Sequence, residues 1–343
     1  MKTIYRGLVA VLVSTLLLAP AKSQNNNTIN QGSAWIKNIP VDDLIKWRRH
    51  IHENAEVSFE EKNTSQYVEG ILKGLGNIEI IRPAKTSVIG VLKGSQAGKT
   101  VAFRADMDAL PVQEETGLTF ASKNENVSHA CGHDAHTAML LATAATLSKM
   151  KDQINGTVYF IFQHAEEQAP GGALDIIKSG ALKNVDAFFG MHVLPNFPAG
   201  DIGILPVGAA STTSDEFHLT IKGKGSHGSM PQLGIDPIVI GAEIVNALQT
   251  IVSRNVTPGE MTVVTIGKFQ SGNAPGPGHV FNAPMMTASE DFSYYKQIAP
   301  ICFLTLGVGN GVANHNPKFN LDEKALQNGV KAQVQIILDY LNQ

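Results

Sequence analysis

The 343-residue sequence carries little net charge, and its low-complexity sequence is confined to short linkers. A formal charge of −3 gives no electrostatic reason to expect nucleic acid or an anionic membrane surface as a partner. We therefore expect a small-molecule partner. Because 43% of the residues are hydrophobic, a chain of this length can bury a large core in one large domain or two modest ones.

Cysteine is scarce, with only two residues of this type. In an exported chain the two could form a disulfide. However, Cys131 lies in a histidine-rich motif, whereas Cys302 lies in the apolar run ICFLTLGVG, which is typical of a buried strand. We therefore predict that Cys131 is a metal ligand and that Cys302 belongs to the core.

The apolar run near the N-terminus is too short to cross a bilayer. It extends from Leu8 to Leu18 and follows Lys2 and Arg6, whereas a membrane-spanning helix needs roughly 20 apolar residues. Small residues come next, without a cysteine that could carry a lipid anchor. These features predict a cleaved signal peptide over residues 1–23 and an exported protein, periplasmic or secreted.

The chain that follows alternates helices with apolar strands. Helical spacing of apolar residues predicts two helices between Val41 and Leu75, broken near Asn54. Nearly continuous apolar strands that alternate with helices indicate an α/β fold, with a sheet covered by helices on both faces. The further elements predicted here are strands at Ile78–Ile81, Ser87–Leu92, Thr100–Arg104, Gly156–Gln163 and Val185–Met191 and a helix at about Ala135–Met150.

A unit with a different pattern interrupts this domain. Its segments EFHLTIKGKG and EMTVVTIGKFQ alternate like half-exposed strands, and Asp236 to Arg254 between them has the pattern of an amphipathic helix. A Gly/Pro-rich passage then returns to an apolar strand, Ile301–Val308, and to a closing helix, Asp322–Leu341. The predicted divisions are a main domain in two parts, residues 34–210 and 276–343, and an insert, residues 211–275.

The motif SHACGHDAH, Ser128 to His136, concentrates groups that bind metal ions. Cys131 and His133 lie two positions apart on a loop, so that both could reach one metal centre. Asp134 and His136 either support such ligands or simply begin the next helix, where an acidic residue is favourable. We therefore interpret the motif as half of a metal site.

The other half is predicted at strand ends, because catalytic groups of α/β sheets gather beyond the carboxyl ends of the strands. Glu166 and Glu167 directly follow one apolar strand, His192 follows another, and His315 lies in a loop after a third. A hydrolytic metal site needs several N, O or S ligands, an open coordination position and a base. The adjacent glutamates could divide these tasks, with one binding metal and the other acting as general base.

Seven motifs together resemble one known family. They are FRADMDALP, HACGHDAHTAML, FQHAEE, GMHVLP, GKGSHGSMPQLGIDP, SEDFSYY and NHNPKF. In order and spacing they resemble the aminoacylase and carboxypeptidase family of dinuclear metal amidohydrolases, most closely the branch with hippurate hydrolases, N-acetyldiaminopimelate deacetylases and plant auxin-conjugate hydrolases. The resemblance extends over nearly the whole chain from Asp42 onward. It implies a zinc-peptidase-like catalytic domain with a mixed sheet, and it makes the insert a small α+β lid of the dimerisation type.

The resemblance also implies the cofactors. Two divalent metal ions are expected, with zinc preferred for a thiolate ligand and manganese, cobalt or nickel as alternatives. The residues that match the family's metal ligands are Cys131, His133, Glu167, His192 and His315.

Four further residues match functional positions of the family. Glu166 matches the general base, and Asp108 matches the carboxylate that orients a ligand histidine. His227, in GSHGS, matches a lid histidine that stabilises the oxyanion, often from the partner subunit. Asn273, in GNAP, matches an asparagine that contacts the substrate.

The activity that the resemblance implies is hydrolysis of the amide bond of N-acyl amino acids, with hippurate-like or N-acetyl amino acids or short peptides as substrates. A metal-activated water would attack the amide carbonyl, with Glu166 as its base. A homodimer formed through the lid is a further expectation.

The lid is shorter than in this family, because SGNAP passes almost at once into GPGHVFNAPMMTASEDFSYY. Two strands and one helix form a marginal sheet with an unprotected edge. A second interpretation is therefore a catalytically impaired member of the family that binds a metal ion or a peptide. A third, a cysteine hydrolase with Cys131 as nucleophile, leaves the paired glutamates and two histidines at the strand ends without a role.

Overall fold

One mixed sheet forms the centre of the molecule. The computed structural model describes residues 34–204, 219–257, 262–266, 269, 290–309 and 311–342. In this part of the chain seven strands pair in the order β1-β2-β4-β3-β5-β7-β6. They are β1 (Glu79–Ile81), β2 (Val88–Lys93), β3 (Gln96–Asp106), β4 (Asn155–Gln163), β5 (Ala187–Leu194), β6 (Ile202–Ile204) and β7 (Ile301–Gly307). The central strands β4, β3, β5 and β7 are mutually parallel, so their carboxyl ends meet at one edge of the sheet.

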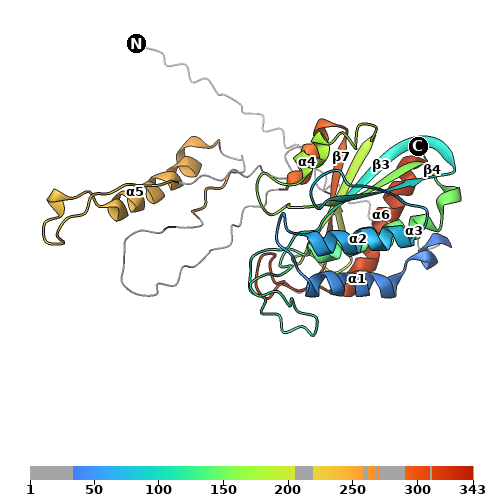
Figure 1. Ribbon diagram of the computed structural model, residues 1–343, viewed down its shortest axis with the longest axis horizontal. Helices are drawn as coiled ribbons and strands as arrows, with labels where there is room; N and C mark the ends of the chain where they lie inside the picture. The colour runs from blue at the N-terminus through green and yellow to red at the C-terminus, as the bar shows by residue number, and fades with distance from the viewer. Residues whose placement is uncertain are drawn as a thin grey trace, which may run out of the picture. The chain divides into compact units, whose positions relative to one another are not determined.

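Helices cover both faces of this sheet. The α-helices are α1 (Val41–Glu53), α2 (Lys62–Gly74), α3 (His133–Ser148), α4 (Ala173–Lys178), α5 (Pro237–Thr250) and α6 (Leu326–Leu341). Short 3-10 or π turns are η1 (Ala34–Asn38), η2 (Lys151–Gln153), η3 (Pro231–Leu233), η4 (Ile251–Asn255), η5 (Asp291–Gln297) and η6 (Glu323–Ala325). Helix α3 packs on β3 between α1 and α6, while α4 and η5 contact each other. In Figure 1 the helices α1, α2 and α3 lie together on one side of the strands.

Two consecutive phenylalanines show why the central strands are apolar throughout. Phe188 stacks on Tyr295 of η5, with ring centroids 5.0 Å apart. Phe189, the next residue of β5, points to the other face and contacts Phe103 of β3 and Tyr340 of α6. Because successive side chains of a strand point to opposite faces, burial of both faces requires a continuous apolar run. The predicted α/β fold with a two-sided sheet is therefore confirmed.

Most of the predicted helices and strands of the main domain are present, with two corrections. Strand β5 continues to Leu194, so His192 lies within the strand and not after it. Cys302 lies in β7 but is only partly buried, so it is not a core residue. The short neighbour β6 pairs only with Leu304 to Leu306, which leaves the start of β7 less covered. Both cysteines are free.

The described residues of the predicted lid, residues 211–275, contain the predicted helix but not the predicted strands. Helix α5 begins where predicted, because the Asp236 carboxylate accepts a hydrogen bond of 2.8 Å from the backbone N–H of Ile238. The described residues of the two flanking segments, 219–225 and 262–266, belong to no strand, and Lys224 makes only an isolated bridge with Ile235. A two-stranded sheet of this size gains little from pairing alone. The predicted signal peptide and Asn273 lie outside the described residues.

Within the described ranges, no helix is long and apolar enough to cross a bilayer.

Candidate metal centre

Five side chains from different elements converge at the carboxyl edge of the parallel strands. The Cys131 Sγ atom lies 3.4 Å from Nε2 of His192 and 3.2 Å from Nε2 of His315. The Glu167 Oε1 atom lies 3.3 Å from Nε2 of His315 and 3.7 Å from Nε2 of His133. The structure therefore brings together all five residues that the family resemblance implies as ligands.

Among the groups of possible donor atoms in the described residues, two share Cys131. In each group the donor atoms lie within 4.8 Å of one another: one contains Cys131, His133 and His192, and the other contains Cys131, Glu167 and His315. Because Cys131 belongs to both groups, the arrangement has the donors for two neighbouring ions. Thiolate, imidazole and carboxylate are the ligands that zinc and similar divalent ions take in proteins.

The buried polar atoms of the centre fit a cation. Nε2 of His133 and Oε1 of Glu167 are buried, and neither makes a hydrogen bond. Leaving such atoms without a partner costs roughly 1–3 kcal/mol each, and more for charged groups. A metal ion bound at each of these atoms would remove this cost.

A glycine allows two of the donors to come from neighbouring positions. Gly132, between Cys131 and His133, has φ +91°, and a Cβ atom there would lie 2.4 Å from Cγ2 of Val193. No other residue fits this conformation and this space. His315 also has a positive φ, 65°, a strained conformation of the kind that collects at functional sites.

Asp108 holds two of the donor residues in place. Nδ1 of His133 donates to the backbone carbonyl of Asp108 at 2.9 Å and lies 3.2 Å from its Oδ1 atom. The Oδ2 atom of Asp108 accepts hydrogen bonds from Oγ of Ser58 at 2.6 Å and from the backbone N–H of Glu167 at 2.9 Å. This pattern fixes the tautomer of His133 and directs its Nε2 atom to the centre.

A longer hydrogen-bond chain reaches His192. Nη1 of Arg104 donates to Oδ2 of Asp106 at 2.7 Å, and Nδ1 of His136 donates to Oδ1 of the same carboxylate at 2.6 Å. Nε2 of His136 accepts from the backbone N–H of Val193 at 2.9 Å, and the Val193 carbonyl accepts from Nδ1 of His192 at 2.9 Å. Both nitrogens of His136 are thus occupied, and His192 is left with Nε2 facing Cys131.

Replacement of His136 by phenylalanine is expected to weaken metal binding, although His136 is not among the five residues that would bind the metal ions. The substitution removes the acceptor of the Val193 N–H and so loosens the backbone of Val193, whose carbonyl orients His192. Loss of such an orienting partner typically lowers metal affinity about 10–100-fold. Competition with a chromophoric chelator measures this, and His136→Gln, whose amide oxygen can accept from Val193, is expected to lose less. Equal affinities of wild type and His136→Phe would contradict the orienting role.

Asp134 is an anchor to helix α1. Its Oδ2 atom accepts from Nε of Arg48 and from Nδ1 of His52, both at 2.8 Å. Burial is the largest single effect and raises the pKa of Asp134, but the charges of Arg48 and His52 and the hydrogen bond from His52 together lower it well below its ordinary value, so the carboxylate is ionised. The first turn of α3, which carries His133, is thus joined to α1 by a buried ion pair.

Burial controls the protonation of several groups at the centre. It lowers the pKa of His192 to well below its ordinary value, which keeps the ring in the neutral form that binds metal. Burial and the carboxylates of Glu167 and Glu166 raise the pKa of the Cys131 thiol, so a bound cation is needed to hold the thiolate. Burial, followed by the charges of Glu290 and Glu167, raises the pKa of Glu166 well above its ordinary range.

A buried ion cluster behind Glu166 was not predicted from the sequence. Nη1 of Arg104 lies 3.1 Å from Glu290, and Nη2 lies 2.8 Å from Asp291, in addition to the contact with Asp106. Burial raises the pKa of Glu290 to about 7, although Arg104 lowers it. The available signal was an arginine inside the otherwise apolar run VAFRA of this strand.

His227 lies in the described lid segment 219–257. Its side chain is exposed, and its Nδ1 atom lies 2.8 Å from Oγ of Ser229. His227 belongs to neither of the donor groups that contain Cys131.

A peptidase-like α/β fold with these donors at the carboxyl ends of its parallel strands is the class that the fold and the site define. The chain belongs to peptidase family M20/M25/M40, whose sequence model matches residues 102–339. The family resemblance of the seven motifs is thereby confirmed.

Named relatives support this membership. The chain is 49% identical over 240 residues to an N-acyl-L-amino acid amidohydrolase of Geobacillus stearothermophilus, which covers 69% of this chain and 65% of the relative. It is 44% identical over 233 residues to an N-acetylcysteine deacetylase of Bacillus subtilis, and this match covers 67% of this chain and 60% of the deacetylase. The chain therefore spans less than two thirds of the length of either relative. Among solved structures, the Bacillus subtilis YXEP protein, a dinuclear metal binding peptidase from the M20 family, has a TM-score of 0.65 and 28% identity over 88% of this chain and 98% of that one.

Proposed function

We propose that this protein is a metal-dependent amidohydrolase that cleaves the amide bond of N-acyl amino acids. The observation that carries the proposal is the pair of donor groups that share Cys131, with Glu166 beside them. The names of the two relatives, an N-acyl-L-amino acid amidohydrolase and an N-acetylcysteine deacetylase, support the substrate class. Similarity to the YXEP protein, a dinuclear metal binding peptidase, supports a centre with two metal ions.

The five donors Cys131, His133, Glu167, His192 and His315 are the residues that would hold the ions. When bound there, two divalent ions, zinc first and manganese, cobalt or nickel as alternatives, would lower the pKa of a water and polarise the amide carbonyl. Asp108 keeps His133 and Glu167 in position throughout the reaction.

Glu166 is the proposed general base. Its Oε2 atom lies 4.0 Å from Nε2 of His133, so the carboxylate faces the donor cluster but is in neither Cys131 group. It takes a proton from the attacking water and returns it to the leaving amine of the amino acid. His227 is the proposed donor to the oxyanion, and Asn273 the proposed contact to the substrate. Substitution of either residue by alanine, with the rate of hydrolysis as the measurement, tests these two roles.

Metal removal is expected to abolish activity reversibly. The purified protein should contain close to two divalent ions per chain, as measured by mass spectrometry of the metals, and dialysis against a chelator should remove both ions and turnover of hippurate or N-acetyl amino acids. Added zinc or manganese should restore the rate. Brief alkylation in the presence of metal should leave the enzyme active, because Cys131 is then a ligand; inactivation under these conditions would favour the cysteine hydrolase instead.

A second candidate function has support in the lid. The predicted strands beside α5 are not formed in the described residues, and Ile238, Val239 and Ile240 of that helix are exposed. A protein with such a lid could bind metal or peptide without turnover. A chimera with a full-length lid that gains activity over an inactive wild type would establish this candidate, and hydrolysis by the wild type excludes it.

Export and assembly complete the proposal. We propose an exported protein, for which the apolar run after Lys2 and Arg6 is the support. Cell fractionation tests it. A homodimer through the lid is proposed from the exposed apolar residues of α5, and sedimentation at several concentrations tests it.

A further inference from the structure

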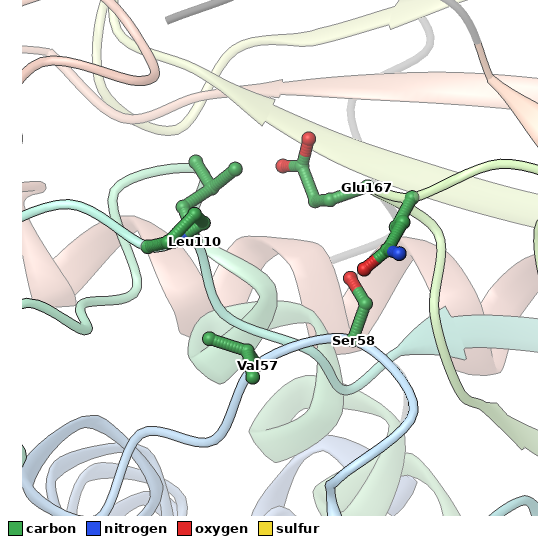
Figure 2. Close-up of a pocket in the computed structure, with 6 residues that line it drawn as sticks. Val57, Ser58, Leu110 and Glu167 are labelled. Carbon is green, nitrogen blue, oxygen red and sulfur yellow. The ribbon is translucent and has the colours of Figure 1, made fainter. Parts of the chain in front are cut away.

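A pocket opens directly beside the donor cluster. Its volume is about 330 Å³. Figure 2 shows Glu167 above it, Leu110 on one side, and Val57 and Ser58 below. The described residues that line it are Val57, Ser58, Leu110, Pro111, Glu167 and Gln168.

The walls of this pocket are held by backbone pairing. Val57 and Ala109 form a parallel bridge, and the N–H of Ala109 donates to the carbonyl of Glu56 at 2.7 Å. Leu110 and Ser128 exchange two backbone hydrogen bonds, each of 3.0 Å. The side chains of Val57 and Leu110 are therefore presented from fixed backbone, and the pocket exists before a ligand arrives.

The chemistry of the lining favours an uncharged, apolar group. Val57, Leu110 and Pro111 supply hydrocarbon surface, and the hydroxyl of Ser58 already donates to Asp108. None of the described lining residues is a lysine or an arginine, while Glu167 is a carboxylate. An anionic end group buried among these side chains would have no lysine or arginine of the lining to pair with.

The pocket lies beside a donor residue, and its lining decides which half of the substrate enters. Glu167 lines the pocket and also belongs to the donor group with Cys131 and His315, so a group in the pocket is joined to the reacting carbonyl or lies next to it. The amino acid half carries its carboxylate on the carbon that bears the side chain. Seating that half here would place its carboxylate against the hydrocarbon of Val57, Leu110 and Pro111, where no described lining residue offers a positive charge, whereas the acyl half brings no charge.

We propose that this pocket binds the acyl group of the substrate and selects uncharged acyl groups larger than acetyl; this rests on the proposed amidohydrolase function. The volume is roughly eleven times the ~30 Å³ that a water molecule occupies in the liquid, so it holds an acyl chain of about six to ten non-hydrogen atoms. Straight-chain hexanoyl and benzoyl groups have this size. Leu110 is a specificity-determining residue, because its side chain forms one wall.

The first experiment compares acyl groups on one amino acid, with metal-loaded protein. We expect kcat/KM for the N-hexanoyl and N-benzoyl substrates to exceed that for the N-acetyl substrate at least about tenfold. N-butanoyl and N-succinyl substrates differ by a terminal carboxylate, and we expect the butanoyl substrate to be preferred by at least about tenfold. Equal rates for butanoyl and succinyl would overturn the apolar assignment.

The second experiment narrows the pocket with Leu110→Trp. We expect the ratio of kcat/KM for the hexanoyl substrate to kcat/KM for the acetyl substrate to fall about tenfold or more. Ile204→Trp, at an exposed position of the edge strand β6, is the matched control and should leave both values unchanged. Thermal unfolding confirms that both variants fold. An equal loss for acetyl and hexanoyl substrates would overturn the role of Leu110.

The same variants separate this proposal from the proposed function. If acetyl substrates turn over but acyl length has no effect, only the acyl pocket is wrong. If metal-loaded protein cleaves no N-acyl amino acid, the proposed function is wrong, and equilibrium dialysis with N-hexanoyl amino acid then tests the pocket. Binding at least about fivefold weaker to Leu110→Trp than to wild type supports the pocket, and equal binding overturns it.

Discussion

Glu166→Gln is expected to lower kcat about a thousandfold while the protein keeps its full complement of metal. Proton transfer by a positioned side chain contributes typically about 10²–10⁴-fold to a rate, and glutamine cannot accept the proton. The substitution is nearly isosteric, and Glu166 is outside both donor groups that contain Cys131. Metal content per chain and kcat with an N-acyl amino acid, measured on the same preparation, test both halves of the expectation.

The neighbouring Glu167→Gln is the matched control for this prediction. Glu167 lies 3.3 Å from His315 and lacks a hydrogen bond at its buried Oε1 atom, so its replacement is expected to lower metal content together with activity. Both variants change one carboxylate to an amide, one position apart. If Glu166→Gln lost metal to the same degree as Glu167→Gln, Glu166 would be a ligand, as its proximity to His133 and Glu167 also permits.

Local sequence patterns were sufficient to predict the elements that carry the centre. The continuous apolar runs of β4 and β5 reflect a sheet that is buried on both faces, as the opposite directions of Phe188 and Phe189 show. Because the central strands are parallel, residues that follow them had to arrive at one edge. The convergence of Glu167 and His315 near Cys131 follows from this topology.

The contacts that organise the centre were not predictable in the same way. Arg104 donates a hydrogen bond to Asp291, which lies 187 positions further along the sequence. The periodic spacing of apolar residues within a helix or strand does not predict a contact over such a distance in sequence. The tautomers of His133 and His136 depend on which carbonyl, carboxylate or N–H lies opposite each ring nitrogen. In the predicted lid, the alternation of apolar and polar residues predicted two strands. A strand also needs a pairing partner, and the described residues of this segment form only one isolated bridge.

Arg104→Leu is expected to destabilise the fold by about 3–5 kcal/mol, the usual cost of breaking a buried ion pair from one side. The Arg104 side chain is 2% exposed and pairs with Asp106, Glu290 and Asp291, whose side chains are between 1% and 11% exposed. Without the guanidinium these three carboxylates remain buried, and no other lysine or arginine of the described residues pairs with them. Urea denaturation measures this loss of unfolding free energy. An unchanged dependence of that free energy on urea concentration would show that wild type and variant expose the same surface on unfolding.

Arg49→Leu supplies the control for burial, and pH supplies a second test of the cause. Arg49 pairs with Glu323, but its side chain is 47% exposed, so its loss should cost less than about 1 kcal/mol.

The pH test concerns Glu290. Burial raises its pKa to about 7 in the wild type, although Arg104 lowers it. In Arg104→Leu this pKa is expected to rise further, because the lowering effect of Arg104 is lost. A carboxyl whose pKa is higher in the folded state than in the unfolded state loses stability as pH rises and regains it as pH falls. The stability gap between wild type and Arg104→Leu should therefore be smaller at about pH 5 than at about pH 8. A gap that is equal at both pH values, or no larger than that of Arg49→Leu, would show that Arg104 acts through packing and not through the charges of its three carboxylate partners.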